Sequence, residues 1–460
     1  MTETNPMHTP TRRFSPTHAA ARLCIFFLTS TIMAHADPAD IGVRGGSPDA
    51  GKPLPGLTAD EFNAFQIART VFQEVVSVSG TISGEDDGGL GPTFNMNSCV
   101  GCHAQPAIGG TSPRLNPQVR IATLHGARNV VPSFITADGP VREVRFKRKP
   151  DGSPDGGVHG LFVITGRSDA PPANRAVQPD FAAELANRNL SFRIPTPLFG
   201  TGLIEAITED TILANKRANS SSKARFGITG HENRNGNDGT ITRFGWKAQN
   251  KSLLIFAGEA YNVEQGVTND LFPNARESGP GWTGGPELES TMDLATGGIS
   301  DTDQFAIFMR LLAPPEPDLP AHIRRDSVER GEDHFTNVGC ILCHTGSLTT
   351  GSNAVAALSN KKAALFSDLL LHNMGPRLAD DISQGNAGGD EFRTAPLWGV
   401  GQRIFFLHDG RTKDLFDAIQ AHASNGNSRH PDSEANKSVA AFNDLRNSEQ
   451  QDLLNFLRSL

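Results

Sequence analysis

The sequence has few cysteines, no excess of basic residues and no long apolar segment beyond its N-terminal region. Its 42 Lys and Arg residues are outnumbered by 50 Asp and Glu residues, and the resulting net charge of −8 does not favour binding to nucleic acid. No internal stretch is long and apolar enough to span a bilayer. We find no repeat with the period of a solenoid, which excludes that architecture.

The N-terminal 36 residues have the features of an export signal. Three Arg residues precede a short apolar run at 23–33, and an Ala-His-Ala tripeptide then matches an A-x-A cleavage site. We expect a signal peptide over residues 1–36 that is cleaved before Asp37, and a periplasmic mature protein. A retained membrane anchor is the alternative, but the apolar run is too short for one.

Five cysteines occur in the chain, and one of them, Cys24, lies in the expected signal peptide. The other four belong to two C-x-x-C-H motifs, which are NSCVGCHAQPAIGG with Cys99, Cys102 and His103, and NVGCILCHTG with Cys340, Cys343 and His344. An exported chain meets an oxidising compartment, where spare thiols form disulfides. No thiol outside the motifs is left over for this.

In a C-x-x-C-H motif the two sulfurs form thioether bonds to the vinyl groups of a haem, and the His binds its iron. A zinc ribbon would place its second C-x-x-C pair about 15–20 residues away. A disulfide redox motif would not need the His. We therefore expect two covalently bound c-type haems, haem 1 with His103 as its proximal ligand and haem 2 with His344.

Apolar stripes near both motifs predict helices. Thr58 and Glu61 form a capping box that starts one helix before the first motif, and the segment SVERGEDHFTN forms another before the second motif. Ser448 and Gln451 form a further capping box that starts the final Leu-rich helix. These helices predict a mainly α fold with two cytochrome c-like haem domains.

The Pro-rich stretch LAPPEPDLP at 312–320 predicts a linker between the two domains, which then cover residues 37–325 and 326–460. The first domain is larger than one haem requires, and the chain contains 47 Gly and 30 Pro residues. We expect a large loop-rich insertion in this domain. It contains some β structure, since PVREVRFKR and GLFVITGR alternate like strands.

Several segments resemble the bacterial di-haem cytochrome c peroxidase superfamily, most closely its di-haem oxidoreductase branch. The segments are GLGPTFNMNSCVGCHAQPAIGG, RIPTPLFGTGLIEAI, FGWKAQ, AYNVEQGVTN and FRTAPLWGVGQRIFFLHDGRTKDLFDAI. The last is specific, because the peroxidases have a similar Thr-Pro turn followed by an aromatic-His-Asp-Gly sequence. The resemblance implies an exported peroxidase in which haem 1 handles hydrogen peroxide. Haem 2 then accepts electrons from a small donor protein, a cytochrome c or a cupredoxin.

The resemblance implies catalytic roles for Glu264 and Trp246. Glu264 in YNVEQG matches a glutamate that stands over the catalytic haem, where a carboxylate can take a proton from one peroxide oxygen and give it to the other. Trp246 in FGWKAQ matches the tryptophan that relays electrons between the haems. Glu205 in GLIEAI and Trp398 in APLWGV stay open as alternatives for these two positions.

The sixth ligand of haem 2 departs from the family pattern. In the peroxidases a methionine follows the His-Asp-Gly turn and its helix, whereas the matching residue here is His422. Ligation by two imidazoles predicts a lower reduction potential than ligation by His and Met. Met374 and His372 are the alternative ligands. Haem 1 has no clear sixth ligand, with His125 and His159 as candidates, and an open position is what peroxide binding would require.

The resemblance also implies binding residues around the haems. His408 lies near haem 2 and its propionates, and Arg411 can pair with a propionate through its guanidinium fork. Thr394 and Pro396 match a turn that binds calcium between the haems in relatives, although one turn does not supply the oxygen cage that calcium needs. Relatives are often homodimers, and the sequence shows no dimer interface.

Peroxide reduction is the leading hypothesis. Two alternatives stay open: an oxidase or oxygenase that acts on a protein side chain or an organic molecule, and a two-haem electron carrier without catalytic activity.

Overall fold

The computed structural model describes residues 37–45, 50–85, 87–276 and 298–460. The expected signal peptide lies outside the described residues. Residues Asp37–Leu460 form one unit. Among the described helices, none has both the length and the apolar character needed to cross a membrane.

The described part of the chain is rich in helices. They are α1 (Ala59–Gln73), α2 (Cys99–Cys102), α3 (Gln118–Ile121), α4 (Phe181–Ala186), α5 (Thr201–Ala206), α6 (Glu209–Arg217), α7 (Ser220–Phe226), α8 (Leu253–Ala260), α9 (Asp301–Leu311), α10 (Arg325–Asn337), α11 (Gly375–Leu378), α12 (Leu415–Ala421), α13 (Asn436–Asn443) and α14 (Asn447–Ser459). Short 3₁₀ turns are η1 (Leu124–Gly126), η3 (Cys340–Leu342) and η4 (Val400–Gln402), and η2 (Tyr261–Gln265) is a π-helical turn.

The strands form small antiparallel sheets. They are β1 (Thr93–Phe94), β2 (Glu143–Phe146), β3 (Val158–His159), β4 (Phe162–Val163), β5 (Leu190–Arg193), β6 (Asn233–Arg234), β7 (Ile241–Thr242), β8 (Leu348–Thr349), β9 (Lys362–Ala363), β10 (Leu371–Asn373) and β11 (Glu391–Arg393). The largest described sheet has the order β3-β2-β5, with Val144 opposite His159 and Phe192. The expected strands in PVREVRFKR and GLFVITGR are confirmed as β2 and β4.

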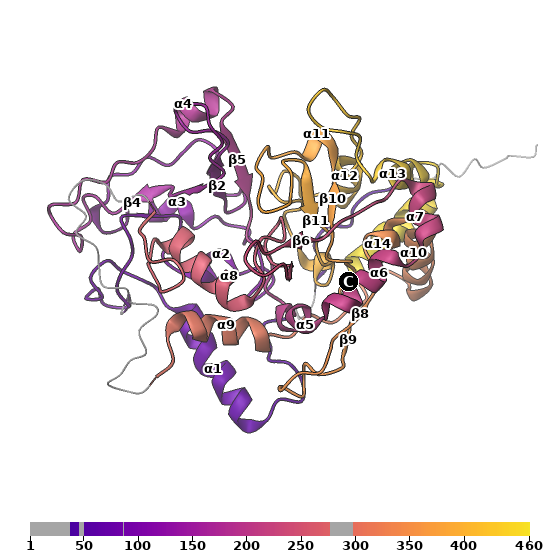
Figure 1. The fold of residues 1–460 in the computed structure, drawn as a ribbon, viewed down its shortest axis with the longest axis horizontal. Helices are drawn as coiled ribbons and strands as arrows, with labels where there is room; N and C mark the ends of the chain where they lie inside the picture. The colour runs from indigo at the N-terminus through magenta and orange to yellow at the C-terminus, as the bar shows by residue number, and fades with distance from the viewer. Residues whose placement is uncertain (1–36, 46–49, 86, 277–297) are drawn as a thin grey trace, which may run out of the picture. The chain divides into compact units, whose positions relative to one another are not determined.

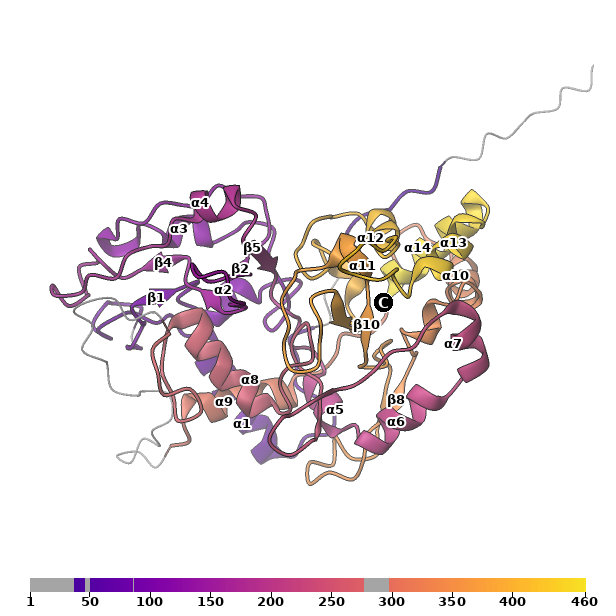
Figure 2. The same ribbon diagram turned by 45° about the horizontal axis from the view of Figure 1, so that its top comes forward.

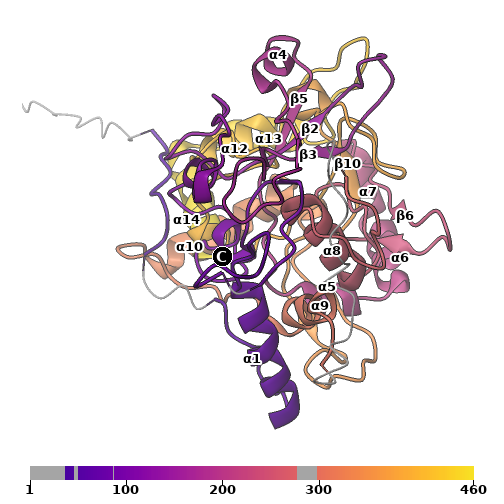
Figure 3. The same ribbon diagram turned by 90° about the vertical axis from the view of Figure 1, so that its left-hand side faces the viewer.

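Helix α1 begins at the predicted capping box. The Thr58 hydroxyl accepts the backbone N–H of Glu61, and the Glu61 carboxylate accepts the N–H of Thr58. The helix buries Phe65 and Phe72 against α9, and the rings of Phe72 and Phe308 stack with centroids 4.4 Å apart. Helices α1 and α9 lie side by side in Figure 1, and Figure 3 shows α8 next to α9. These three helices form the core below the first motif.

Helices α10 and α14 pack against each other beside the second motif (Figure 2). A Cβ atom on Gly331 would lie 2.0 Å from the carbonyl oxygen of Asp452, so only glycine allows this close approach. The capping box predicted at Ser448 and Gln451 is wrong. The helix begins two residues earlier than expected, because the Glu449 carboxylate accepts the N–H of Arg446 at 2.9 Å.

Segments from before residue 325 also contact the region of the second motif. The Asn215 amide donates to the Thr345 hydroxyl at 3.1 Å, and Lys437 donates to the carbonyl of Arg225 at 2.7 Å. Helix α7 accordingly lies next to α10 in Figures 1 and 2. The helix-rich fold with small sheets agrees with the expected class. Two cytochrome c-like domains with a boundary at 325 stay a prediction.

Candidate functional site

The first C-x-x-C-H motif opens into a cavity of about 970 Å³, which Cys99, Cys102 and His103 line. His103 directly follows α2, and its Nδ1–H donates to the carbonyl oxygen of Gly110 at 2.8 Å. Its Nε2 has no hydrogen bond to another described residue. Burial lowers the pKa of His103 to about 4, so the imidazole is neutral and can bind a metal through Nε2.

The second motif opens into a larger cavity of about 1450 Å³, lined by Cys340, Cys343, His344 and His422. The Nδ1–H of His344 donates to the Phe366 carbonyl at 3.0 Å, and that of His422 donates to the Ala418 carbonyl at 2.7 Å. Burial, followed by the charge of His422, lowers the pKa of His344 to about 4. Both neutral imidazoles therefore keep Nε2 for a ligand in this cavity.

The residues in both cavities fit a haem. The motif cysteines and histidine lie together in each wall, and none of these cysteines is in a disulfide. Each candidate iron-binding histidine has its tautomer fixed by a backbone carbonyl, as is usual for metal-bound histidine. Phe and Leu side chains form much of the second cavity, which suits a porphyrin ring.

The other candidate ligands of haem 2 differ in whether their donor atoms are already engaged with other residues. Met374 lines the second cavity, and so does His372. However, the Nδ1 of His372 lies 2.8 Å from a Glu434 carboxylate oxygen, and its Nε2 lies 3.0 Å from Asp368. Both ring nitrogens of His372 are thus engaged with carboxylates. His422 offers a second imidazole with an unbonded Nε2 in this cavity, and His408, which also lines it, has no side-chain hydrogen bond to another described residue.

Glu264 lines the first cavity from the π-helical turn η2, which continues α8. The segment that leads into the first motif holds this turn, because the N–H of Asn95 donates to the Glu264 carbonyl at 2.7 Å and that of Gly91 donates to the Gln265 carbonyl at 2.9 Å. A Cβ atom on Gly91 would lie 2.1 Å from the Gly266 carbonyl oxygen. The position of Glu264 is therefore coupled to that of the first motif.

Two charged residues of β2, Glu143 and Arg145, line the same cavity, and sequence reasoning missed both. Glu143 forms an ion pair with Arg145 and a side-chain hydrogen bond with Glu264. Burial, followed by the charge of Glu143, raises the pKa of Glu264 well above its usual value. The cavity thus contains a carboxyl group with a raised pKa, Glu264, next to Glu143, which is ion-paired with Arg145.

Trp246 lines both cavities. Its Nε1–H donates to the carbonyl of Ile194 at 2.9 Å, and its ring centroid lies 6.4 Å from that of His408 in an edge-on arrangement. His408 lines the second cavity and stacks on Phe392, with centroids 4.2 Å apart. Trp398 instead lines a third cavity, described below.

Several other predicted residues lie outside the two motif cavities. The Glu205 carboxylate pairs with Arg310 at 2.7 Å, and Arg411 pairs with Asp409 at 2.7 Å. His125 lies 2.8 Å from a Glu85 carboxylate oxygen, and His159 lies 3.2 Å from one of Asp155. Glu205, Arg411, His125 and His159 are absent from the described lining of both motif cavities.

A third cavity of about 500 Å³ contains Pro396 in its wall. The charged residues in its described lining are Arg243, Arg393 and Arg403. The Thr394 carbonyl, which lies nearby in the chain, accepts the Ser367 hydroxyl at 2.6 Å. Three guanidinium groups do not favour a cation, so calcium binding at Thr394 and Pro396 stays a prediction without support from the charges here.

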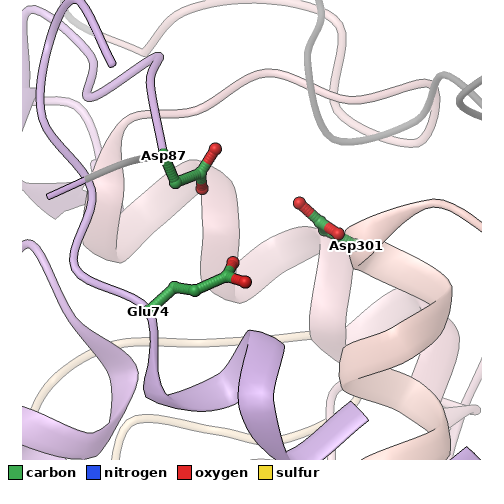
Figure 4. Close-up of side chains that lie close together, drawn as sticks. All are labelled: Glu74, Asp87 and Asp301. Carbon is green, nitrogen blue, oxygen red and sulfur yellow. The ribbon is translucent and has the colours of Figure 1, made fainter. Parts of the chain in front are cut away.

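Glu74, Asp87 and Asp301 form an acidic cluster away from the motif cavities (Figure 4). Their carboxylate oxygens lie within 4.8 Å of one another, and the side chains point toward one another. Burial, followed by the charges of Asp301 and Asp87, raises the pKa of Glu74 to about 7. Acidic groups often gather without an ion, so we assign no metal to this half-buried cluster.

Residues 147–460 match the family model for di-haem oxidoreductase, putative peroxidase. The chain belongs to this family. Membership implies an oxidoreductase of peroxidase type with two haems. The match includes the second motif, Trp246, Glu264 and His422, whereas the first motif and Glu143 precede it.

Solved structures with partial similarity include three redox proteins. The Kuenenia stuttgartiensis hydrazine synthase is 18% identical, with 35% of this chain and 56% of that chain covered and a TM-score of 0.23. The di-haem peroxidase BthA from Burkholderia thailandensis is 14% identical, with 47% of this chain and 65% of that chain covered and a TM-score of 0.29. A MauG-like protein associated with microbial copper homeostasis is 18% identical, with 55% of this chain and 89% of that chain covered and a TM-score of 0.28. TM-scores this low carry no functional conclusion. No curated protein matches the chain.

Proposed function

We propose that this protein is an exported di-haem c-type peroxidase, which reduces hydrogen peroxide to water with two electrons from a small donor protein. The observation that carries the proposal is the Glu143–Glu264 pair in the wall of the cavity that contains His103. Within the described lining of that cavity, His103 is the only histidine. The described lining of the cavity that would hold haem 1 thus offers no second imidazole, which favours the binding of a small substrate there.

Cys99 and Cys102 would bind haem 1 through thioether bonds, with His103 on its iron. Cys340 and Cys343 would bind haem 2, with His344 and His422 on its iron. A haem held at each motif would supply a redox-active iron, and the one held in the first cavity would supply the site at which peroxide reacts. The remaining chemistry is proton transfer and electron relay, which fall to side chains of the protein.

Glu264 can act as the proton carrier for cleavage of the peroxide O–O bond. Its raised pKa favours the protonated carboxyl group, and this proton can go to the departing oxygen. The resulting carboxylate can then accept the proton of the other oxygen. Glu143 forms an ion pair with Arg145 and hydrogen-bonds Glu264, so it orients the acid.

Trp246 is placed to relay electrons, because its indole belongs to the walls of both cavities. His344 and His422 would hold haem 2 through two imidazoles, which would suit electron exchange at an electron-entry haem. A small cytochrome c or cupredoxin is the proposed donor, and the N-terminal segment supports a periplasmic location. The homodimer and the calcium ion implied by the resemblance are not needed for this proposal and stay predictions.

Steady-state peroxide reduction tests the proposal. Purified holo-protein should consume hydrogen peroxide only when a reduced small cytochrome c is present, with two donor molecules oxidised per peroxide. Reversible oxidation of the haems without peroxide consumption would indicate an electron carrier instead. Uptake of dioxygen with incorporation into an organic or protein substrate would indicate an oxygenase.

A further inference from the structure

The third cavity connects the regions of the two motifs through shared walls. Trp246 lines all three cavities, while Gly245 is shared with the first cavity and Arg393 and Arg403 are shared with the second. The described lining of the third cavity contains three arginines and neither Asp nor Glu. A pocket lined in this way is electrostatically suited to an anion.

Arg403 is buried and its guanidinium has no hydrogen bond or ion pair with another described residue. Burial alone lowers its pKa to about 10. Arg393 is also buried, and its Nε–H donates to the Gly245 carbonyl at 3.0 Å, but no carboxylate pairs with it. Burial is likewise the cause that lowers the pKa of Arg393 to about 10. These two arginines therefore carry buried charge without a counter-ion from the described chain.

The third arginine and a neighbouring group add to the positive charge. The Nε of Arg243 is buried without a partner, although its other nitrogens donate to backbone carbonyls. Arg193, which lines the first cavity, and Lys247 share the single carboxylate of Asp380, at 2.8 Å and 3.1 Å. The charges of Glu209 and Glu205 act on Arg243, whereas burial alone acts on Arg393 and Arg403. Buried charges without partners are costly, so these two arginines favour an anionic ligand.

We propose that Arg393 and Arg403 bind the propionate carboxylates of haem 2 in the third cavity. This inference depends on the presence of haem 2, as in the proposed function, but not on peroxide as substrate. Both arginines belong to the wall of the second cavity, and a guanidinium fork matches a carboxylate in shape and charge. Arg411, which the family resemblance offers for this role, is already neutralised by Asp409.

The placement has an electrostatic consequence. Two guanidinium groups beside haem 2 favour its reduced state, because reduction removes one positive charge from the iron. They also lie in the same cavity wall as Trp246, where electrons would leave haem 2. Arg393 and Arg403 would thus seat haem 2 and raise its reduction potential.

The test is spectroelectrochemistry of the holo-protein with R403Q, R393Q and the double variant, after both haems have been quantified by their pyridine haemochrome. The potential of haem 2 should fall in each single variant and fall further in the double variant. R403K keeps the charge and should shift less than R403Q. R324Q is the control, since Arg324 is exposed, pairs with Asp326 and is absent from the described lining of all three cavities, and it should leave the potential unchanged.

The same samples distinguish propionates from an anion taken from solution. Titration of the wild type with acetate and with phosphate should give no saturable change in potential if propionates already occupy the site. A saturable response that R403Q abolishes would overturn the proposal in favour of a free-anion site. Unchanged potentials in R403Q, R393Q and the double variant would also overturn it. Absence of peroxide turnover in the wild type would contradict the proposed function alone.

Discussion

Glu264 and Glu143 form a hydrogen-bonded carboxyl pair in the wall of the cavity that surrounds Cys99, Cys102 and His103. The two residues come from separate elements, the π-helical turn η2 and strand β2. Arg145 is ion-paired with Glu143, and burial, followed by the charge of Glu143, raises the pKa of Glu264. Glu264 can therefore serve as the acid in the cavity where peroxide would be cleaved.

Replacing Glu264 with Gln should slow peroxide reduction by about 10²–10⁴-fold, the usual contribution of a general acid–base group. Haem content should stay the same, since Glu264 is not a predicted haem attachment residue. The measurement is steady-state turnover with a reduced cytochrome c donor. E205Q is the matched control, because Glu205 pairs with Arg310 outside the motif cavities. Equal rates in E264Q and the wild type would remove Glu264 from the mechanism.

Replacing Glu143 with Gln should move the pH dependence of kcat/KM. The charge and hydrogen bond of Glu143 raise the pKa of Glu264, second to burial, so their removal lowers that pKa. A group that must be protonated loses activity as pH rises through its pKa. The alkaline limb of the E143Q profile should therefore lie at lower pH than that of the wild type. An alkaline limb at the same pH as in the wild type would show that Glu143 does not affect the pKa of Glu264.

Replacing His422 with Met should raise the reduction potential of haem 2, because Met/His ligation favours the reduced iron more than ligation by two imidazoles. Redox titration followed by optical spectroscopy measures the shift. M374L serves as the control, since Met374 lines the same cavity. If M374L changes the spectrum and potential while H422M does not, Met374 is the ligand.

Replacing Trp246 with Phe should slow electron transfer between the haems and leave both haems attached. The change removes the Nε1–H that donates to Ile194, with a stability cost of about 1 kcal/mol. Stopped-flow spectroscopy of the half-reduced protein after mixing with peroxide follows the oxidation of haem 2. W398F, which alters a tryptophan outside both motif cavities, should oxidise at the wild-type rate. Equal slowing in the two variants would argue for a packing effect.

Short-range patterns predict the helices around the motifs well. Capping and apolar spacing place α1 correctly at Thr58 and Glu61, because each of these signals acts over a few residues. The same reasoning fails at the start of α14. Ser448 and Gln451 fit the capping pattern, but Glu449 reaches the backbone of Arg446 and starts the helix earlier. Competing caps a few residues apart cannot be ranked from the sequence.

The site residues that reach the cavities only through tertiary packing could not be predicted from the sequence. Glu143 and Arg145 alternate with Val144 and Phe146 on β2, a pattern that normally indicates a polar face toward solvent. Here that face meets the cavity of the first motif. Arg393 is part of the segment FRTAPLWGVGQR, but its lack of a carboxylate partner becomes visible only when the surrounding elements are assembled. The C-x-x-C-H motifs, by contrast, predict their chemistry from local spacing alone.

We expect the two haems to be unequal, with an open position at haem 1 and two imidazoles at haem 2. Electron paramagnetic resonance of the oxidised holo-protein tests it most directly, in the resting state and after reduction by one electron. We expect one high-spin ferric signal from haem 1, and one low-spin signal from haem 2. Two low-spin signals in the resting protein, with the remaining haem still low-spin after one-electron reduction, would contradict the account.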